Sequence, residues 1–320
     1  MSKAFLYSAV LSLCAVNALA AGDLEENVQK ISELFGKMSE AVRAKNYKGL
    51  FTFEVGGSLD TYKIVHRVAN DIETERLQKL NGREREIIRS GHSPACLSRG
   101  DRLLRGLPVT LEETKKLLLN YRVYLASDER VANRMAYVVH VIPADGHRYG
   151  YTYAVDKLTN LPLKIMLIGE NKKVLERFQF VQLEVGDIVT EEDVLPRSQN
   201  VLSAKNDLIN CDEVKTEESE WVARWIPNGF VYSGQRTTDK GDAVLMFTDG
   251  LASFSIFVSR QNGLAMQGRA QTGATVAYVE HRVWDKKPFS VYVVGQIPLA
   301  TSRQIAASLE KVSLAAVVKP

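Results

Sequence analysis

The sequence predicts an α+β protein of two domains, each built on an antiparallel sheet. Three observations lead to this prediction. Apolar residues alternate with polar ones in many short runs separated by turn residues, which is typical of antiparallel strands. Helical periodicity appears near residues 24–44, 110–119 and 302–314. Between residues 187 and 219 the apolar pattern lapses and acidic and small polar residues accumulate, so this segment is predicted to link a larger first domain to a smaller second one.

The N-terminal residues 1–20 have the composition of a cleavable secretory signal. Lys3 supplies the positive start, an apolar run extends from Ala4 to Val16, and small residues precede a cleavage point after Ala20. A retained membrane anchor would need about 20 unbroken apolar residues, and this run ends at Asn17. We therefore expect export to an envelope compartment.

Charge and cysteine content narrow the class of protein. Removal of Lys3 with the signal lowers the net charge from +3 to +2, and a near-neutral chain is not typical of a nucleic-acid-binding protein. Cys14 follows Leu13 where a lipidated cysteine would follow a small residue, so lipidation is not expected. Cys96 and Cys211 remain after cleavage, and the sequence leaves open whether these two thiols pair.

The predicted first domain, residues 21–186, begins with an amphipathic helix and continues as a meander of strands. Apolar residues recur at three- and four-residue steps from Leu24 to Ala44, and the period changes to two at Tyr47. Thr110 and Glu113 form a capping box that starts a second, short helix. The strands are predicted near residues 47–55, 61–68, 72–79, 84–89, 121–125, 135–142, 148–155, 162–168 and 174–184.

One of these strands carries a dense aromatic face. Tyr149, Tyr151 and Tyr153 alternate with small residues, so their rings point to the same side of the sheet. Such a face has to be covered by a helix, by another sheet or by a ligand. The three tyrosines are candidates for the wall of a ligand cavity, and packing in the domain core is the more ordinary alternative.

The predicted second domain, residues 220–320, contains short strands and a final helix. The helix is expected from Ser302 to about Leu314, with Ile305, Leu309 and Val312 on one face. The strand signals lie near residues 221–230, 243–247, 251–258, 264–270, 275–283 and 289–297.

The sequence contains no recognisable catalytic or metal-binding motif. Its five histidines lack the close spacing of a zinc site, and there is no nucleophile elbow, zinc-protease motif or phosphate-binding loop. Ser308 and Lys311 match one element of a serine-enzyme signature whose other elements are missing. We therefore predict a binding protein with no catalytic residues, metal or cofactor. A hydrolase whose site is assembled from dispersed residues is the alternative.

Two groups of arginines are candidates for binding phosphates or carboxylates. Arg99, Arg102 and Arg105 lie on a predicted loop with Asp101 as the one acid nearby, and we take them as candidates for contact with a lipid headgroup. The second group lies on strands among glutamates, and an exposed, charge-balanced sheet face is its simpler interpretation. Its members are Arg67, Arg76, Arg83, Arg85 and Arg89.

Six strings stand out in the two predicted domains: in order, they are Arg130–Arg134, Asp145–Tyr151, Asp156 with Leu161–Leu163, Trp225–Phe230, Asp249–Val258 and Val293–Pro298. These strings resemble the RseB/MucB family of periplasmic regulators, and the resemblance covers essentially the whole mature chain. Asn133 departs from the family pattern where glycine is expected, but Asn tolerates a left-handed backbone.

The resemblance implies a negative regulator of the envelope-stress sigma factor in the periplasm of a Gram-negative bacterium. Members of the family bind the periplasmic region of a transmembrane anti-sigma factor of the RseA/MucA type and hinder its proteolysis. The first domain would have the lipoprotein-carrier fold, an unclosed antiparallel β-barrel with covering helices. It would sense lipopolysaccharide or the acyl chains of mislocalised lipoprotein, and this ligand would release the anti-sigma factor.

The resemblance does not identify the residues that contact the partner, so we select candidates by residue type. Trp225, Phe230 and Phe254 are our candidates for partner binding, because aromatic residues often anchor interfaces, although core packing is again the alternative. A periplasmic lipid or lipoprotein carrier is the alternative function, and such a carrier would not need the second domain. The oligomeric state is left open, with a homodimer among the options.

Overall fold

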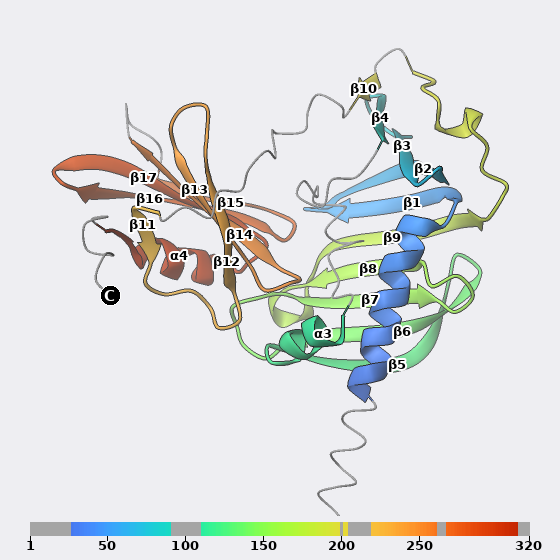
Figure 1. Cartoon of the computed structure of the whole chain (residues 1–320), viewed down its shortest axis with the longest axis horizontal. Coiled ribbons are helices and arrows are strands. Elements are labelled where there is room, and N and C mark those ends of the chain that lie inside the picture. The colour runs from blue at the N-terminus through green and yellow to red at the C-terminus, as the bar shows by residue number, and fades with distance from the viewer. Residues whose placement is uncertain (1–26, 91–109, 199–200, 204–218, 261–266, 313–320) are drawn as a thin grey trace, which may run out of the picture.

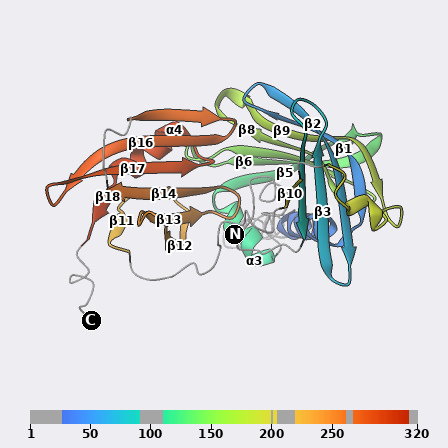
Figure 2. The same ribbon diagram turned by 90° about the horizontal axis from the view of Figure 1, so that it is seen from above.

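The computed structural model describes residues 27–90, 110–198, 201–203, 219–260 and 267–312. A ten-stranded sheet forms the first domain and a six-stranded sheet forms the second. Figure 1 shows the two sheets side by side, and Figure 2 shows the same arrangement from above. The predicted α+β class, with a larger first and a smaller second sheet, is therefore confirmed. The predicted signal, Cys96 and Cys211 lie outside the described residues.

The sheet of the first domain is an unclosed barrel. Its order is β10-β4-β3-β2-β1-β9-β8-β7-β6-β5, and β5 and β10, the outermost of the described strands, do not pair with each other. Among the described pairs, β10 and β4 are parallel and the others are antiparallel. The bounds are β1 Tyr47–Val55, β2 Ser58–Ala69, β3 Ile72–Lys79, β4 Arg85–Ser90, β5 Tyr121–Val131, β6 Arg134–Pro143, β7 Gly150–Asp156, β8 Pro162–Ile168, β9 Val174–Val185 and β10 Val201–Ser203.

A long N-terminal helix, described over residues 27–44, crosses one face of this sheet (Figure 1). The face is aromatic because the register places Phe51 of β1 opposite Phe180 of β9. The Phe35 ring of the helix contacts the Tyr153 ring edge to face, with 6.0 Å between the ring centroids. Helix and sheet thus share one core, to which the helix contributes the buried side chains Ile31, Phe35, Met38, Ala41 and Val42.

The predicted capping box is confirmed at helix α3 (Leu111–Leu118). The Thr110 hydroxyl oxygen accepts a hydrogen bond from the Glu113 N–H at 3.1 Å, and the Glu113 carboxylate accepts one from the Thr110 N–H at 3.0 Å. These two bonds satisfy backbone donors that the first turn leaves free. Across the part of the chain that the structure describes, helices are too short or too polar to cross a membrane.

The second domain packs helix α4 (Leu299–Ala307) against β16 and β17 of its sheet. The sheet order is β12-β13-β14-β17-β16-β15, and a separate two-stranded sheet joins β11 to β18. Its core contains buried Ile256, Val293 and Ile305. The bounds are β11 Trp221–Ala223, β12 Val231–Thr237, β13 Ala243–Thr248, β14 Ser253–Arg260, β15 Gly268–Thr272, β16 Thr275–Trp284, β17 Lys287–Gly295 and β18 Leu309–Lys311.

Two predictions for the second domain are corrected. The predicted final helix should continue to about Leu314, but α4 ends at Ala307 and the chain then forms β18, in which Leu309 is fully buried. Leu309 therefore belongs to a strand and not to the final helix. In addition, β12 has no counterpart in the prediction. Its sequence is polar and includes Gly234, which an edge strand tolerates.

Part of the predicted linker is fixed to the first domain by a buried ion pair. Arg76 of β3 donates to Glu86 of β4, and both side chains are almost completely buried. The second carboxylate oxygen of Glu86 accepts the backbone N–H of Arg197 at 3.0 Å and of Ser198 at 2.7 Å. Arg76 is thus no member of an exposed, charge-balanced face. Its pair with Glu86 anchors the chain as it leaves the first domain.

Candidate functional site

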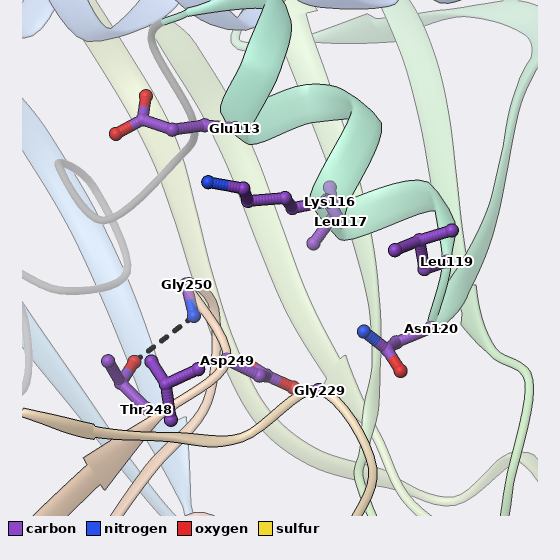
Figure 3. A pocket seen from close by; sticks show the side chains of 10 residues that line it. Glu113, Lys116, Leu117, Leu119, Asn120, Gly229, Thr248, Asp249 and Gly250 are labelled. Atoms are coloured by element: carbon purple, nitrogen blue, oxygen red, sulfur yellow. Dashed lines mark hydrogen bonds between the residues drawn. The ribbon is translucent and has the colours of Figure 1, made fainter.

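A groove of about 390 Å³ lies between helix α3 and the second domain (Figure 3). Figure 3 shows the helix on one side and the turn between β13 and β14 on the other. We call it the interdomain groove and define it by its lining residues, Glu113, Lys116, Leu117, Leu119, Asn120, Gly229, Val231, Thr248, Asp249 and Gly250.

The first-domain wall of the groove combines an anchored helix with an exposed apolar side chain. Leu117 is 2% exposed and belongs to the first-domain core, so it fixes the position of α3. Leu119, just after the helix, is 80% exposed. Val231, at the start of edge strand β12 on the opposite wall, is 60% exposed. Each of these two side chains would gain from being covered by apolar atoms of a partner.

The second-domain wall is a turn held by its own side chains. The Thr248 hydroxyl oxygen accepts the Gly250 N–H at 3.1 Å, the bond drawn in Figure 3. Asp249 Oδ1 accepts the N–H of Leu251 at 3.0 Å and of Ala252 at 2.7 Å. The left-handed backbone at Gly250, with φ of +97°, completes the turn. One carboxylate oxygen of Asp249 is therefore fully used in shaping this wall.

Arg148 lies beside the groove and joins the two domains. Its side chain is fully buried and forms ion pairs with Asp145 at 3.1 Å and with Asp249 Oδ2 at 2.9 Å. It also donates to the backbone carbonyl of Asn228, directly before Gly229 of the groove. The guanidinium lies 5.0 Å from the centre of the Phe230 ring, close enough for a cation–π contact.

Tyr121 completes this arrangement from the first residue of β5. Its hydroxyl donates to Asp249 Oδ2 at 2.9 Å, and its ring lies 5.5 Å from the Arg148 guanidinium. Burial, together with the charge of Asp249, raises the pKa of Tyr121 well above its usual value of 10. The hydroxyl therefore stays protonated and available as a donor. We call Tyr121, Arg148 and Asp249 the junction cluster.

Two of the predicted ligand-binding tyrosines also reach the second domain. The Tyr149 hydroxyl donates to the carbonyl of Ile297 at 3.1 Å, and the Tyr151 hydroxyl donates to the carbonyl of Leu251 at 3.4 Å. Burial raises the pKa of Tyr149 to about 12. Tyr153, in contrast, packs beneath the N-terminal helix. The face that the three rings share is thus covered by a helix at one end and by the second domain at the other.

A second contact between the domains lies at the turn between β15 and β16. The Ala274 N–H donates to the buried Glu176 carboxylate of β9 at 2.9 Å. Gly273 has a φ of +58°, and a Cβ placed there would lie 2.5 Å from a Glu176 oxygen and 2.6 Å from a Val55 methyl. The turn therefore fits against β1 and β9 only with glycine at this position.

The predicted partner-binding aromatics occupy the same region. Phe230 and Phe254 are 4% and 2% exposed, and their rings lie 5.2 Å apart in the second-domain core. Trp225 is half-buried, with its ring 5.1 Å from that of His147 across the domain boundary. All three lie close to the junction, but their rings serve packing in this structure. The predicted headgroup residues Arg99, Arg102 and Arg105 lie outside the described residues.

The sequence interpretation missed the junction cluster. Arg148 and Asp249 both stand inside strings that carried the resemblance, next to the turn signals Asp145-Gly146 and Asp249-Gly250. A charged residue within an otherwise apolar or turn-forming string is the signal that could have pointed to them. Among the described residues, no cluster of histidine, cysteine and carboxylate side chains could hold a metal ion.

Comparison with known proteins gives matches along most of the chain. The family model described as the MucB/RseB N-terminal domain matches residues 30–198, and the MucB/RseB C-terminal domain matches residues 215–310. The sigma factor AlgU regulatory protein MucB of Pseudomonas aeruginosa is 36% identical over 312 residues, which cover 93% of this chain and 94% of that protein. The sigma-E factor regulatory protein RseB of Salmonella typhimurium is 25% identical and covers 87% of this chain and 89% of its own length.

A solved structure shares the fold as well. The complex structure of Pseudomonas aeruginosa MucA/MucB contains a chain that superposes with a TM-score of 0.69 at 31% identity. The match covers 88% of this chain and 99% of that one.

Proposed function

Because the chain belongs to the MucB/RseB family, we propose that it regulates a sigma factor by binding the periplasmic region of a transmembrane anti-sigma factor and hindering its proteolysis. Support comes from MucB of Pseudomonas aeruginosa, which is a regulatory protein of sigma factor AlgU and has been solved together with MucA. The chain would act in the periplasm after export, by binding and not by catalysis.

We place the partner site in the interdomain groove. The observation that carries this placement is the pair of exposed apolar side chains, Leu119 at 80% and Val231 at 60%, on opposite walls. Lys116 and Glu113 on the first wall offer charged groups beside them. A partner segment with apolar side chains would cover both walls at once, and each leucine-sized side chain that becomes buried is worth about 1.5–3 kcal/mol. Such a segment would contact both domains.

Release by lipopolysaccharide or by lipoprotein acyl chains is the second part of the proposal. Its support is the unclosed sheet with its apolar aromatic face, which acyl chains would reach by displacing the helix or the second domain that covers it. Tyr151 and Tyr153 face the covering helix and the second domain, so a ligand on this face would act on the surfaces that hold the domains together. Titration of the protein–partner complex with lipid A should displace the partner, and an unchanged partner affinity would refute this second part.

Isothermal titration of the mature protein with the periplasmic domain of an anti-sigma factor from the same organism tests the binding site. Leu119→Glu and Val231→Glu should each weaken binding about tenfold or more, because a charge replaces a buried apolar contact. Leu158→Glu is the matched control, since Leu158 is 84% exposed on the turn after β7 and distant in sequence from both walls. Equal affinity for all three variants would refute the site, and absence of binding by the unaltered protein would refute the function.

A further inference from the structure

We propose that Arg148 and Asp249 are positioning residues that set the separation of the groove walls by holding the two domains in one orientation. This inference rests on the proposed function in that the groove is taken as the partner site. It assigns the control of that site to a buried ion pair across the domain boundary. Any change in the relative orientation of the domains would then also change the separation of the groove walls.

The first argument is the reach of the Arg148 side chain. Its guanidinium bonds to Asp249 in the β13–β14 turn and to the carbonyl of Asn228 in the segment that leads to β12. It also stacks near Tyr121, which directly follows Asn120 of the opposite wall. Both second-domain segments that line the groove, and the end of the first wall next to Tyr121, are therefore tied to one cation, and a shift of that cation would move them relative to one another.

The second argument is that the two carboxylate oxygens of Asp249 bond to different parts of the protein. Oδ1 accepts two N–H groups within its own turn, so it shapes the second domain internally. Oδ2 accepts Arg148 at 2.9 Å and Tyr121 at 2.9 Å, so it bonds only across the domain boundary among the described contacts. A substitution that changes Oδ2 alone should therefore disturb the bonds between the domains and leave the β13–β14 turn intact.

The third argument is burial. The Arg148 and Asp249 side chains are both fully buried. Removal of Arg148 leaves the buried Asp249 carboxylate without its counter-charge, and removal of the Asp249 charge leaves Arg148 with Asp145 alone. Either change is unfavourable in a site away from water. The domains would then reorient until water or another group reaches the remaining charge. An exposed ion pair could not have this effect, because water would replace the lost partner at little cost.

These observations imply that partner binding and domain orientation are thermodynamically coupled. A partner that fits the groove only at one wall separation stabilises the orientation that provides it. The orientation in turn sets the affinity for that partner by the same factor. Loss of the ion pair should therefore weaken partner binding even when the change is made at Arg148, which is not among the residues that line the groove.

Asp249→Asn is the decisive variant, because the amide retains an acceptor for the turn and replaces Oδ2 by a donor that faces Arg148. Asp156→Asn is the matched control: Asp156 is likewise fully buried and paired with an arginine, Arg134, at 2.8 Å, but within the first domain. Spin labels at Leu158→Cys and Lys240→Cys, in a background with Cys96 and Cys211 replaced by serine, report the interdomain distance by pulsed electron resonance.

We expect a single narrow distance for the unaltered protein and a broader or shifted distribution for Asp249→Asn. Partner affinity should fall about tenfold or more in Asp249→Asn, and excess partner should restore the narrow distance. Asp156→Asn should keep both the distance and the affinity. Should Asp249→Asn not fold, Tyr121→Phe removes one of the two interdomain bonds that Asp249 Oδ2 accepts and should give a smaller change in the same direction.

An unchanged distance in Asp249→Asn and Tyr121→Phe would overturn the proposal, as would a changed distance with unchanged partner affinity. If the unaltered protein binds no anti-sigma partner, the proposed function fails. In that case a changed distance in Asp249→Asn still supports the role of the ion pair in setting the groove.

Discussion

Several buried charged side chains among the described residues form bonded pairs, and each pair fixes a different part of the chain. Arg76 with Glu86 holds the linker, and Arg148 with Asp249 joins the domains. Asp156 accepts Arg134 at 2.8 Å and the N–H of Thr159 at 3.0 Å, and so ties the β6 start to the turn after β7. Such pairs are weak evidence for stability but strong constraints on geometry, because each charge depends on its partner.

Asp156→Asn should lower the free energy of unfolding by about 2–4 kcal/mol at pH 7, because it leaves Arg134 without its carboxylate. Burial raises the pKa of Asp156, but the bonds from Arg134 and Thr159 outweigh burial and hold the pKa below its usual 3.8. The charged form therefore stabilises the fold above pH 3.8, and this contribution is lost as pH falls below that value.

Urea unfolding of both proteins across pH 3–7 measures this effect, and the difference between them should shrink at the acid end. Asp128→Asn is the control, because Asp128 pairs with Lys157 at the surface and should contribute less than about 1 kcal/mol. Equal losses in the two variants would contradict the assignment of Asp156.

At the scale of elements, local pattern accounts for most of the first domain. Strand β8 has the predicted bounds, and the capping box of α3 is present as predicted. Both depend on neighbours in sequence, namely alternation and a three-residue spacing. The left-handed backbone predicted at Asn133 is also found, with φ of +63°.

Elements that depend on distant partners were missed or misjudged. Strand β12 has little apolar alternation because one of its edges pairs with no other described strand. Strand β18 looks helical because its buried Leu309 continues the spacing of α4. The junction cluster joins residues more than a hundred positions apart, as Arg148 and Asp249 are. No local period encodes such a pairing, so the interdomain groove could not be predicted from the sequence pattern.

Glu86→Gln should free the first part of the linker while the sheet stays folded. The amide cannot accept from Arg76 and both backbone N–H groups as the carboxylate does. Hydrogen exchange at the Arg197 and Ser198 amides should accelerate about tenfold to a hundredfold. Glu75→Gln is the control, since Glu75 is also nearly buried and pairs with Arg89 on the same strands.

The unaltered protein should show the same release in acid. Burial raises the pKa of Glu86, but the bonds from Arg76, Ser198 and Arg197 outweigh burial and hold it below 4.5. The linker should therefore be fixed above pH 4.5 and loosen as pH falls below it. Protection of these two amides that persists in Glu86→Gln would contradict the role of Glu86.

At the scale of the whole molecule, several contacts hold the domains together, and two of them come from different turns of the second domain. One is the junction cluster beside the groove, and the other is the turn at Gly273 and Ala274 against β1 and β9. A single contact would let one domain rotate about it, whereas two separated contacts fix the orientation of the domains. The domains therefore behave as one body while both contacts are formed.

Gly273→Ala should disturb the second contact more than a backbone effect alone explains. Gly241 has a similar positive φ of +82°, but a Cβ there meets nothing within 4 Å, so Gly241→Ala should cost about 1 kcal/mol. Gly273→Ala adds a steric conflict with Val55 and Glu176, and should cost about 1–3 kcal/mol more. Thermal unfolding and small-angle scattering measure the stability and the shape, and equal effects of the two substitutions would contradict this contact.

The pairing of β11 with β18 brings together the first and the last described strands of the second domain. Trp221 lies opposite Lys311, the Val312 N–H donates to the Glu220 carbonyl at 2.7 Å, and Arg224 pairs with Glu310 at 2.6 Å. A domain with adjoining termini is suited to circular permutation. Its ends could be joined by a short bridge and new ends opened at the exposed turn near Lys240. The fold of this domain would then depend on which strands lie next to one another, and not on the order in which the strands are synthesised.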